Sequence, residues 1–544
     1  MSSKLQEKCP VCNHTAIELS RKQIGNQILI NLQCNHLLFV DVIEDSKLND
    51  YSAITFDGDN NCNHQWGLEK NRTTCLKCNA HKLYDFQVTG ASLIEKYNGR
   101  FALFDQQGLG KTIQALAYLK LNSSAIPFLW VTKAGIKYQH CREITRILGD
   151  SYFPQVLKKG TDKLFPGFKS YLSSYDLLKK IDLSEITSIG IKCIILDECQ
   201  AIMNPSALRT QALRTIVKQV DKIIPTSGTP WKNRGPEFFT VLNMLDAKMF
   251  HNYQHFINTE VGYYYQGNKL VTGGIAKPKE FKEKTQHILI RREREEVMPE
   301  LPIISRHKFL VEVPKSARLA YKEEEDKLVQ IFNDALLEGT EDSFETQKAM
   351  NTILMQMKQI VGIAKIPSTV ELAQDFLSET DRKLTIFVHH KECARLIENQ
   401  LKTYCMENYL PLPLVLSSAM SPEERFTCQE KFNGNKYRLL IASTLASGEG
   451  LNLQSCSDCI MHERQWNASN EEQAEGRFIR IGQTSTAVVA TYVHGDDTID
   501  TILDGIVENK RIAFQASWDK EVKASFDESA VTKDIILEIV RRRR

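Results

Sequence analysis

The stretch that most constrains the fold is residues 100–121, where a short apolar segment, a glycine loop and an apolar-periodic segment follow one another. "RFALF" (100–104) is typical of a buried strand, and the periodic segment predicts a helix that begins near Lys111. A strand that leads through a tight loop into a helix is the repeating unit of a parallel sheet covered by helices. The order of these segments therefore predicts an α/β fold.

The loop itself, "DQQGLGKT" (105–112), is similar to a phosphate-binding loop, although Asp105 stands where the pattern G-x-x-x-x-G-K-[ST] has its first glycine. Its two glycines let backbone amides approach a phosphate, and the start of the helix adds its positive end. Lys111 would reach the β- and γ-phosphates, and Thr112 would bind Mg²⁺. The predicted phosphate-binding residues are Gly108, Leu109, Gly110, Lys111 and Thr112.

A second apolar run, "CIILDEC" (193–199), ends in two adjacent carboxylates. This arrangement suits hydrolysis of a nucleoside triphosphate, with Asp197 holding Mg²⁺ and Glu198 polarising the attacking water. "SGTPWKN" (227–233) follows at the end of another strand, with small hydroxyl residues suited to sense the phosphates. The sequence therefore predicts a nucleotide-hydrolysing site.

Six ordered motifs then resemble those of the Swi/Snf-like ATPases of helicase superfamily two. They are "DQQGLGKT", "LDECQ", "SGTPWKN", "ILIRREREEVMPELP" (288–302), "STLASGEGLNL" (443–453) and "QAEGRFIRIGQ" (473–483). The family's first motif also carries Asp at its opening position. The resemblance covers residues 83–515, and its last part is most similar to the branch with annealing helicases and fork-remodelling translocases.

The resemblance implies roles for further residues of an ATP and Mg²⁺ site. Gln87 matches the glutamine that recognises adenine, and Glu449 and Gly450 lie in the loop that couples nucleotide to nucleic acid. Arg477 and Arg480 match the two arginines of the last motif, of which one or both stabilise charge on the γ-phosphate. The predicted catalytic residues are Lys111, Asp197, Glu198, Arg477 and Arg480.

Three positions depart from the family pattern. Gln200 stands where "DE-x-H" has histidine, and Leu445 replaces the usual arginine after "ST". The usual "D-x-x-W-N-P" is read here as "ERQWNA" (463–468), which keeps the first charge and loses the proline. None of these changes removes a catalytic group, so we expect hydrolysis to survive with altered coupling between ATP and DNA.

The implied fold class is α/β, with two tandem RecA-like parallel-sheet lobes, helical insertions and an N-terminal zinc-binding module. The predicted domains are the zinc-binding module (1–82), the ATP-binding first lobe (83–314), a helical linker (315–366), the second lobe (367–515) and a C-terminal helix with a basic tail (516–544).

Paired cysteines and histidines mark the zinc-binding module, because six of the fourteen cysteines fall within the first 78 residues. Two sets, each with three thiolates and one imidazole, have the composition of closed structural zinc sites, and metal binding could supply folding energy that so small a core lacks. Sequential and interleaved pairings are both compatible with the spacing. The predicted zinc ligands are Cys9, Cys12, Cys34, His36, Cys62, His64, Cys75 and Cys78.

Composition restricts the function only loosely. The 544 residues are 42% hydrophobic and 25% charged with a net charge of +2, and neither a membrane segment nor a secretion signal is evident. We expect a monomeric intracellular protein that moves along duplex or branched DNA, with a protein partner possible through the zinc-binding module. An RNA-dependent ATPase and a non-hydrolysing DNA-binding scaffold are the alternatives. The expected DNA contacts are Lys133, Ser173, Ser174, Ser443 and Thr444.

Overall fold

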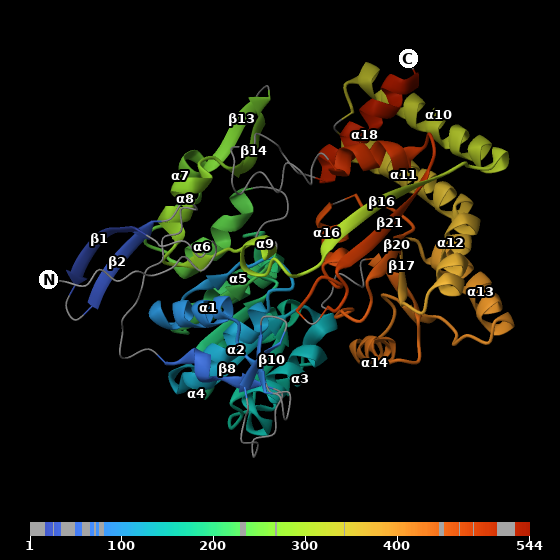
Figure 1. Cartoon of the computed structure of the whole chain (residues 1–544). Helices are drawn as coiled ribbons and strands as arrows, with labels where there is room; N and C mark the ends of the chain where they lie inside the picture. The colour runs from blue at the N-terminus through green and yellow to red at the C-terminus, as the bar shows by residue number, and fades with distance from the viewer. Residues whose placement is uncertain are drawn as a thin grey trace.

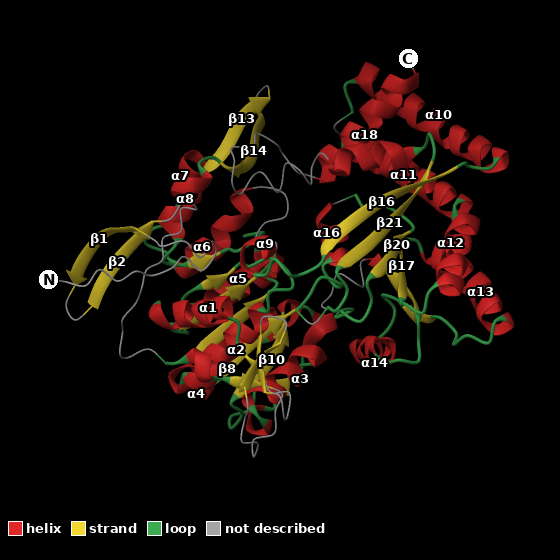
Figure 2. Cartoon of the chain, viewed as in Figure 1, coloured by secondary structure: helices red, strands yellow, loops and turns green. Residues whose placement is uncertain are grey.

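Two α/β lobes lie side by side in the computed structural model, the first from the N-terminal half of the chain and the second from the C-terminal half (Figure 1). Each lobe has a central parallel sheet with helices around it (Figure 2). The structure describes residues 17–24, 27–33, 49–56, 66–69, 72–75, 81–228, 235–266, 269–341, 343–444, 451–466, 468–481, 483–508 and 528–543.

The first lobe has a seven-stranded parallel sheet. Its strands, in spatial order, are β15 (Leu289–Ile290), β7 (Ala102–Leu103), β12 (Lys222–Thr226), β11 (Cys193–Asp197), β8 (Phe128–Thr132), β10 (Ser170–Ser174) and β9 (Gln155–Val156). Its main helices are α1 (Asp85–Lys96), α2 (Lys111–Leu121), α3 (Lys137–Leu148), α4 (Leu183–Ile189) and α5 (Leu208–Val217). Separate apolar cores pack α1–α3 on one face and α4–α5 on the other, which explains why the central strands are apolar throughout.

The second lobe has a six-stranded parallel sheet. Its strands, in spatial order, are β16 (Ile303–Val311), β21 (Ala487–Gly495), β20 (Asp458–Met461), β17 (Leu384–Val388), β19 (Leu439–Ser443) and β18 (Leu414–Leu416). Helices α12 (Ile366–Glu379) and α13 (Lys391–Glu407) pack on one face, and α14 (Pro422–Asn433) and α16 (Ala468–Glu475) pack on the other. Residues 303–311, which the predicted boundary assigns to the first lobe, pair with β21 along their whole length.

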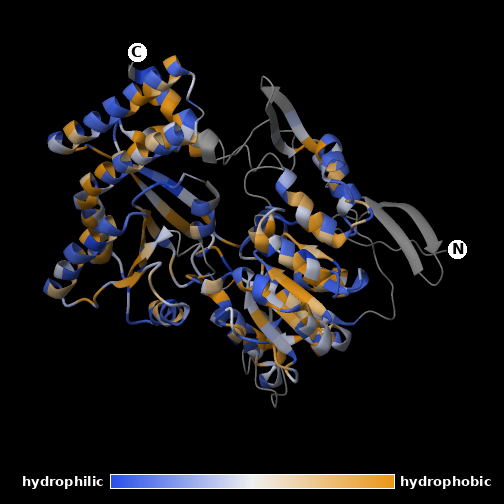
Figure 3. Cartoon of the chain, turned by 180° about the vertical axis from the view of Figure 1, so that it is seen from behind, coloured by the Kyte–Doolittle hydropathy of each residue, from blue (hydrophilic) through white to orange (hydrophobic). Residues whose placement is uncertain are grey.

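The helical linker forms two long helices, α10 (Lys315–Glu338) and α11 (Phe344–Ala364). They share an apolar core with the helical residues 499–508 and with α18 (Glu528–Arg543), next to the second sheet. The helices carry polar and apolar residues along their length, in keeping with one buried face (Figure 3). In the described part of the chain, no helix is long and apolar enough to cross a membrane.

The first lobe also carries an insertion between β12 and β15. It contains α6 (Phe239–Leu245), α7 (Tyr253–Glu260), the hairpin β13 (Val261–Gln266) and β14 (Lys269–Ile275), and α8 (Pro278–Thr285). The hairpin projects away from both sheets (Figure 1). The sequence predicts helical insertions, and α6, α7 and α8 are helices of this insertion. The hairpin of β13 and β14 was not predicted.

The N-terminal region contains two antiparallel sheets. One pairs β1 (Ile17–Ile24) with β2 (Gln27–Gln33), and the other has the order β3 (Thr55–Phe56), β6 (His81–Lys82), β5 (Arg72–Cys75) and β4 (Trp66–Glu69). Cys75 ends β5, whereas the other predicted zinc ligands, Cys9, Cys12, Cys34, His36, Cys62, His64 and Cys78, lie outside the described residues.

Candidate active site

The glycine loop follows β7 and wraps around the side chain of Lys111, the first residue of α2. Gly108 and Gly110 have φ of +92° and +72°. The backbone would be strained there in a residue with a Cβ atom, so these positions favour glycine. The Lys111 ammonium donates to the carbonyl oxygens of Asp105 (2.7 Å) and Gln106 (3.2 Å). Burial lowers the pKa of Lys111, and the charges of Glu198, Asp105 and Asp197 oppose this shift. The loop therefore places a buried cation at the start of a helix, which is the arrangement that binds phosphate.

Asp105 is the residue that departs from the common loop pattern, and it is fully buried in an ion pair. Arg292, which follows β15, donates two hydrogen bonds to its carboxylate, at 2.9 and 2.6 Å. Gln114 on α2 donates a third at 3.0 Å. Asp105 thus joins the loop, the helix after it and the neighbouring edge strand, so its role is to fix the loop rather than to touch phosphate.

Asp197 ends β11 and lies on the same edge of the sheet as the loop. One carboxylate oxygen accepts from Thr226 at 2.9 Å, and the other accepts from Thr132 at 3.2 Å and from the His140 ring at 2.9 Å. Burial alone would raise the pKa of Asp197, but His140, Thr226 and Lys111 outweigh it and lower the pKa to about 2. The side chain is therefore an ionised oxygen donor, which is the kind of ligand that Mg²⁺ takes.

Glu198 and Gln200 show how the site accommodates the absence of the histidine that ends the "DE-x-H" pattern. Glu198 adopts a left-handed backbone conformation (φ +54°), directly after the strand. Gln200 donates to the Glu198 carboxylate and accepts from the Ser227 hydroxyl at 2.7 Å. The glutamine therefore connects the carboxylate pair to the "SGTP" segment by hydrogen bonds of its own.

Arg480 enters this cluster from the second lobe. Burial and the charge of Arg477 lower its pKa to about 9, while Glu143, Glu198 and Asp197 favour its charged form. Arg480 in turn lowers the pKa of Lys111, so the two cations lie near each other. Backbone packing agrees, because a Cβ at Gly108 would collide with the carbonyl oxygen of Ile479. The structure thus brings the two halves of the predicted site together across the lobes.

Gln87 and Thr112 complete the described part of the predicted site. Gln87 on α1 is buried, and its side-chain amide donates to the Leu109 carbonyl oxygen at 3.3 Å. It lies against the loop, because a Cβ at Gly110 would collide with its side-chain nitrogen. Thr112 is half-buried on the first turn of α2. Glu449 and Gly450, together with Leu445 and Trp231, lie outside the described residues.

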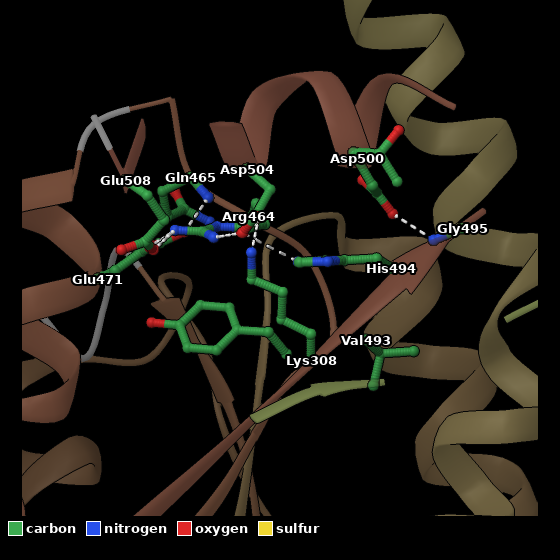
Figure 4. Close-up of polar contacts among 12 residues, drawn as sticks. Lys308, Arg464, Gln465, Glu471, Val493, His494, Gly495, Asp500, Asp504 and Glu508 are labelled. Carbon is green, nitrogen blue, oxygen red and sulfur yellow. Dashed lines mark hydrogen bonds and ion pairs between the residues drawn. The ribbon is translucent and has the colours of Figure 1, made fainter. Parts of the chain in front are cut away.

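A network of buried ion pairs holds α16, the helix that precedes both arginines. Arg464 donates to Glu471 at 3.0 and 2.7 Å and to Glu508 at 2.8 Å, and it also pairs with Asp504 (Figure 4). Its guanidinium stacks over the Tyr492 ring, 4.6 Å from the centroid. Arg464 belongs to the "ERQWNA" segment that departs from the family pattern, and the network ties that segment to α16 and to the helical residues 499–508.

A second contact between the lobes runs along α3 and α14. Arg142 on α3 pairs with Glu430 on α14 at 2.9 Å and lies over the Phe426 ring, 5.6 Å from its centroid. Tyr138 on α3 also hydrogen-bonds Glu423. Within the described residues, the lobes therefore meet at the nucleotide loop and also along this second contact, which we name the α3–α14 seam.

One further group of metal-ligand types occurs among the described residues. His390, Cys393 and Glu463 place one potential ligand atom each within 4.8 Å of one another. However, Glu463 accepts hydrogen bonds from the backbone amides of His389 (2.8 Å) and His390 (2.9 Å). This cluster is accounted for as the acidic cap of α13.

Comparison with known families decides where this site belongs. The model of the SNF2-related domain matches residues 86–363, and that of the helicase conserved C-terminal domain matches residues 365–482. The chain belongs to the SNF2-related family. The two matched regions meet beside the start of α12.

Relatives of this SNF2-related chain share about a quarter of its residues. The human "DNA annealing helicase and endonuclease ZRANB3" is 26% identical over 448 residues, which cover 79% of this chain and 40% of the relative. A Drosophila melanogaster protein named "SWI/SNF-related matrix-associated actin-dependent regulator of chromatin subfamily A-like protein 1" is also 26% identical, over 79% of this chain and 55% of the relative. This chain therefore spans about half or less of the length of these relatives.

Among solved structures, the Sulfolobus solfataricus SWI2/SNF2 ATPase core in complex with dsDNA is 21% identical to this SNF2-related chain. It covers 85% of this chain and 96% of its own, with a TM-score of 0.36.

Several residues of the site were missed by sequence reasoning. Thr132 and Thr226 end the two strands that flank β11, and their positions could have been found from the rule that ligands bind at the carboxyl ends of parallel strands. Arg292 lies in the quoted motif 288–302, in which the sequence assigns no role to an individual residue. His140 and Glu143 lie in the middle of a helix, and the sequence carries no signal for them.

Proposed function

We propose that this protein is an ATP-dependent motor that translocates on duplex DNA and remodels DNA or protein–DNA structures. The observation that carries the proposal is the composite site, in which Lys111, Asp197 and Glu198 of the first lobe face Arg480 of the second. A site assembled from two lobes couples nucleotide chemistry to lobe movement, because hydrolysis changes the contacts that hold the lobes together. The names of the relatives, which include DNA annealing helicases, support the same reading.

The described residues divide the work of ATP hydrolysis. Lys111 and the loop amides bind the β- and γ-phosphates, and Gln87 lies where the resemblance puts the adenine contact. Thr112 and Asp197 would hold Mg²⁺, which when bound neutralises charge on the phosphates. Glu198 orients the water that attacks the γ-phosphorus, and the bond to the β–γ bridging oxygen breaks. Arg480, with Arg477 beside it, stabilises the charge that develops on the transferred group.

DNA binding would rest on contacts to backbone phosphates, which give affinity without sequence choice. Lys133 follows β8 and Ser443 ends β19 of the other lobe, and both are half-buried. In contrast, Ser173 and Ser174 are buried within β10, and Thr444, directly after β19, is also buried, so these three are unavailable for a DNA contact in this conformation. We propose Lys133 and Ser443 as DNA-binding candidates.

The proposal is tested by ATP hydrolysis measured with duplex DNA, single-stranded DNA, RNA and no nucleic acid. We expect strong stimulation by duplex DNA and none by RNA. Lys111→Ala should abolish turnover and leave DNA binding intact, whereas Lys277→Ala, on exposed α8, serves as the matched control. Stimulation by RNA would indicate an RNA-dependent ATPase, and no turnover under any condition would indicate a scaffold.

We also propose that the N-terminal region binds two zinc ions through the two predicted Cys₃His sets. The register of the β4–β5 hairpin supports sequential pairing in the second set, because it sets Cys75 opposite Trp66, only two residues after His64 in the chain. Elemental analysis of the purified protein should find two zinc ions per chain, and Cys75→Ser should remove one. A zinc-free, folded protein would contradict this proposal.

A further inference from the structure

Helix α3 carries a histidine on the face that packs into the core of the first lobe. His140 is 4% exposed, and its ring lies 5.0 Å from the ring of Trp130, centroid to centroid. Its Nε2 lies 2.9 Å from a carboxylate oxygen of Asp197. Since an ionised carboxylate can only accept, His140 donates this hydrogen bond. The contact therefore reaches the carboxylate proposed to bind Mg²⁺ from helix α3.

Glu143 lies one turn further along α3 and faces the opposite lobe. One of its carboxylate oxygens accepts from Gln139 at 3.2 Å, and the other lies 3.7 Å from Nδ1 of His140. Among the carboxylates near Arg480, Glu143 is the one whose charge most favours the charged guanidinium, ahead of Glu198 and Asp197. Glu143 therefore lies beside His140, and its charge favours the charged form of Arg480.

We propose that His140 is a positioning residue for ATP hydrolysis, because its hydrogen bond fixes the carboxylate of Asp197. The inference rests on the proposed function and deepens it. The His140 side chain is not needed to touch the nucleotide. Its effect is to hold the carboxylate in a single geometry, so that little reorganisation is required when Mg²⁺ binds.

Three side chains restrain Asp197 from different elements. Thr132 and Thr226 bind its carboxylate from the strand ends, and His140 binds it from helix α3. His140 therefore ties the orientation of this carboxylate to a helix as well as to the sheet.

The proposed role of His140 is tested by nucleotide binding with and without Mg²⁺. His140→Phe keeps a ring against Trp130 and removes the donor, whereas His140→Gln keeps an N–H at a similar reach. Titration of a fluorescent ATP analogue in EDTA and in Mg²⁺ should show unchanged metal-free binding by His140→Phe but an apparent Mg²⁺ affinity about 10- to 100-fold lower. His140→Gln should restore most of that loss, and His255→Phe, at an exposed position on α7, should behave as wild type.

An unchanged Mg²⁺ requirement in folded His140→Phe would overturn the proposed role of His140. An equal loss of metal-free binding would also overturn it. These titrations need no hydrolysis, so they remain informative even where the ATPase assay fails, and the two failures can be told apart.

Discussion

Asp105 and Gln200 each occupy a position where a more familiar residue is expected, and each is held by specific partners. Asp105 is bound by Arg292 and Gln114, and Gln200 bridges Glu198 and Ser227. In both cases the side chain makes hydrogen bonds that fix a part of the proposed site, the glycine loop for Asp105 and Glu198 for Gln200. At the scale of the residue, a departure from a pattern is therefore judged by its contacts and not by its letter.

Arg480 provides a prediction at this scale. Arg480→Ala should lower the rate of ATP hydrolysis by roughly 10³-fold or more, because the arginine of the second lobe stabilises transition-state charge. Arg480→Lys should recover only part of the rate, since lysine lacks the planar fork of donors. Steady-state ATPase assays with duplex DNA measure both, and ATP binding should change little. Wild-type turnover in Arg480→Ala would show that the arginine has no part in the chemistry.

Helix α16 shows how an element is positioned by charges that never meet the nucleotide. Glu471 is bound by Arg464, and Glu475 by Arg306 of β16 (2.8 and 2.7 Å) and by the Tyr492 hydroxyl (2.7 Å). These contacts fix the helix on the sheet of the second lobe. The turn that follows α16 carries Arg477 and Arg480, so the orientation of the arginines depends on this anchorage.

Arg464→Ala should destabilise the second lobe by about 3–5 kcal/mol, because it removes the guanidinium that neutralises Glu471 and Asp504 in the lobe interior. Urea unfolding followed by tryptophan fluorescence would measure the change. Arg395→Ala removes an exposed pair with Glu392 on α13 and should leave the stability close to that of the wild type. Equal losses in the two variants would show that the Arg464 network is not a structural anchor.

Histidines buried in the second lobe predict its response to acid. Burial lowers the pKa of His462 and of His494 to about 4, below the usual value near 6.5. The unfolded chain therefore takes up these protons first as the pH falls. The second lobe should keep its stability above pH 6.5 and lose it progressively between pH 6.5 and 4. Thermal unfolding across this range should show a shallower loss for His462→Gln, and an identical pH profile would contradict the prediction.

Comparison of elements shows which features sequence patterns can supply. The apolar segment 100–104 contains β7, and the helix expected near Lys111 begins there as α2. These elements have strong local signals. Strand β16, by contrast, is largely exposed, and its place in the second sheet depends on pairing with β21, which lies more than 170 residues away in the chain. His140 acquires its role in the same way, from a distant partner, Asp197.

At the scale of the whole molecule, the α3–α14 seam links lobe closure to surface charge. Arg142 and Glu430 are 60% and 45% exposed, so their pair contributes at most about 1 kcal/mol and is weakened by salt. Arg142→Glu should shift the lobes toward an open arrangement by a few-fold, and adding Glu430→Arg should restore closure. Energy transfer between dyes on the two lobes would measure it. No rescue by the double variant would argue against the pair.

The crossing from β15 to β16 sets how far each part of the molecule travels. The two strands are edge strands of their sheets, and β15 adjoins β7, which leads into the nucleotide loop. The opposite edge of the first sheet, β9, lies six strand spacings away, or about 29 Å. If the first lobe rotates about this crossing, the nucleotide loop moves least because it is near the axis, and the far edge at β9 moves most. A rotation of about 10° would displace β9 by about 5 Å, which is more than the rise of about 3.4 Å between successive base pairs.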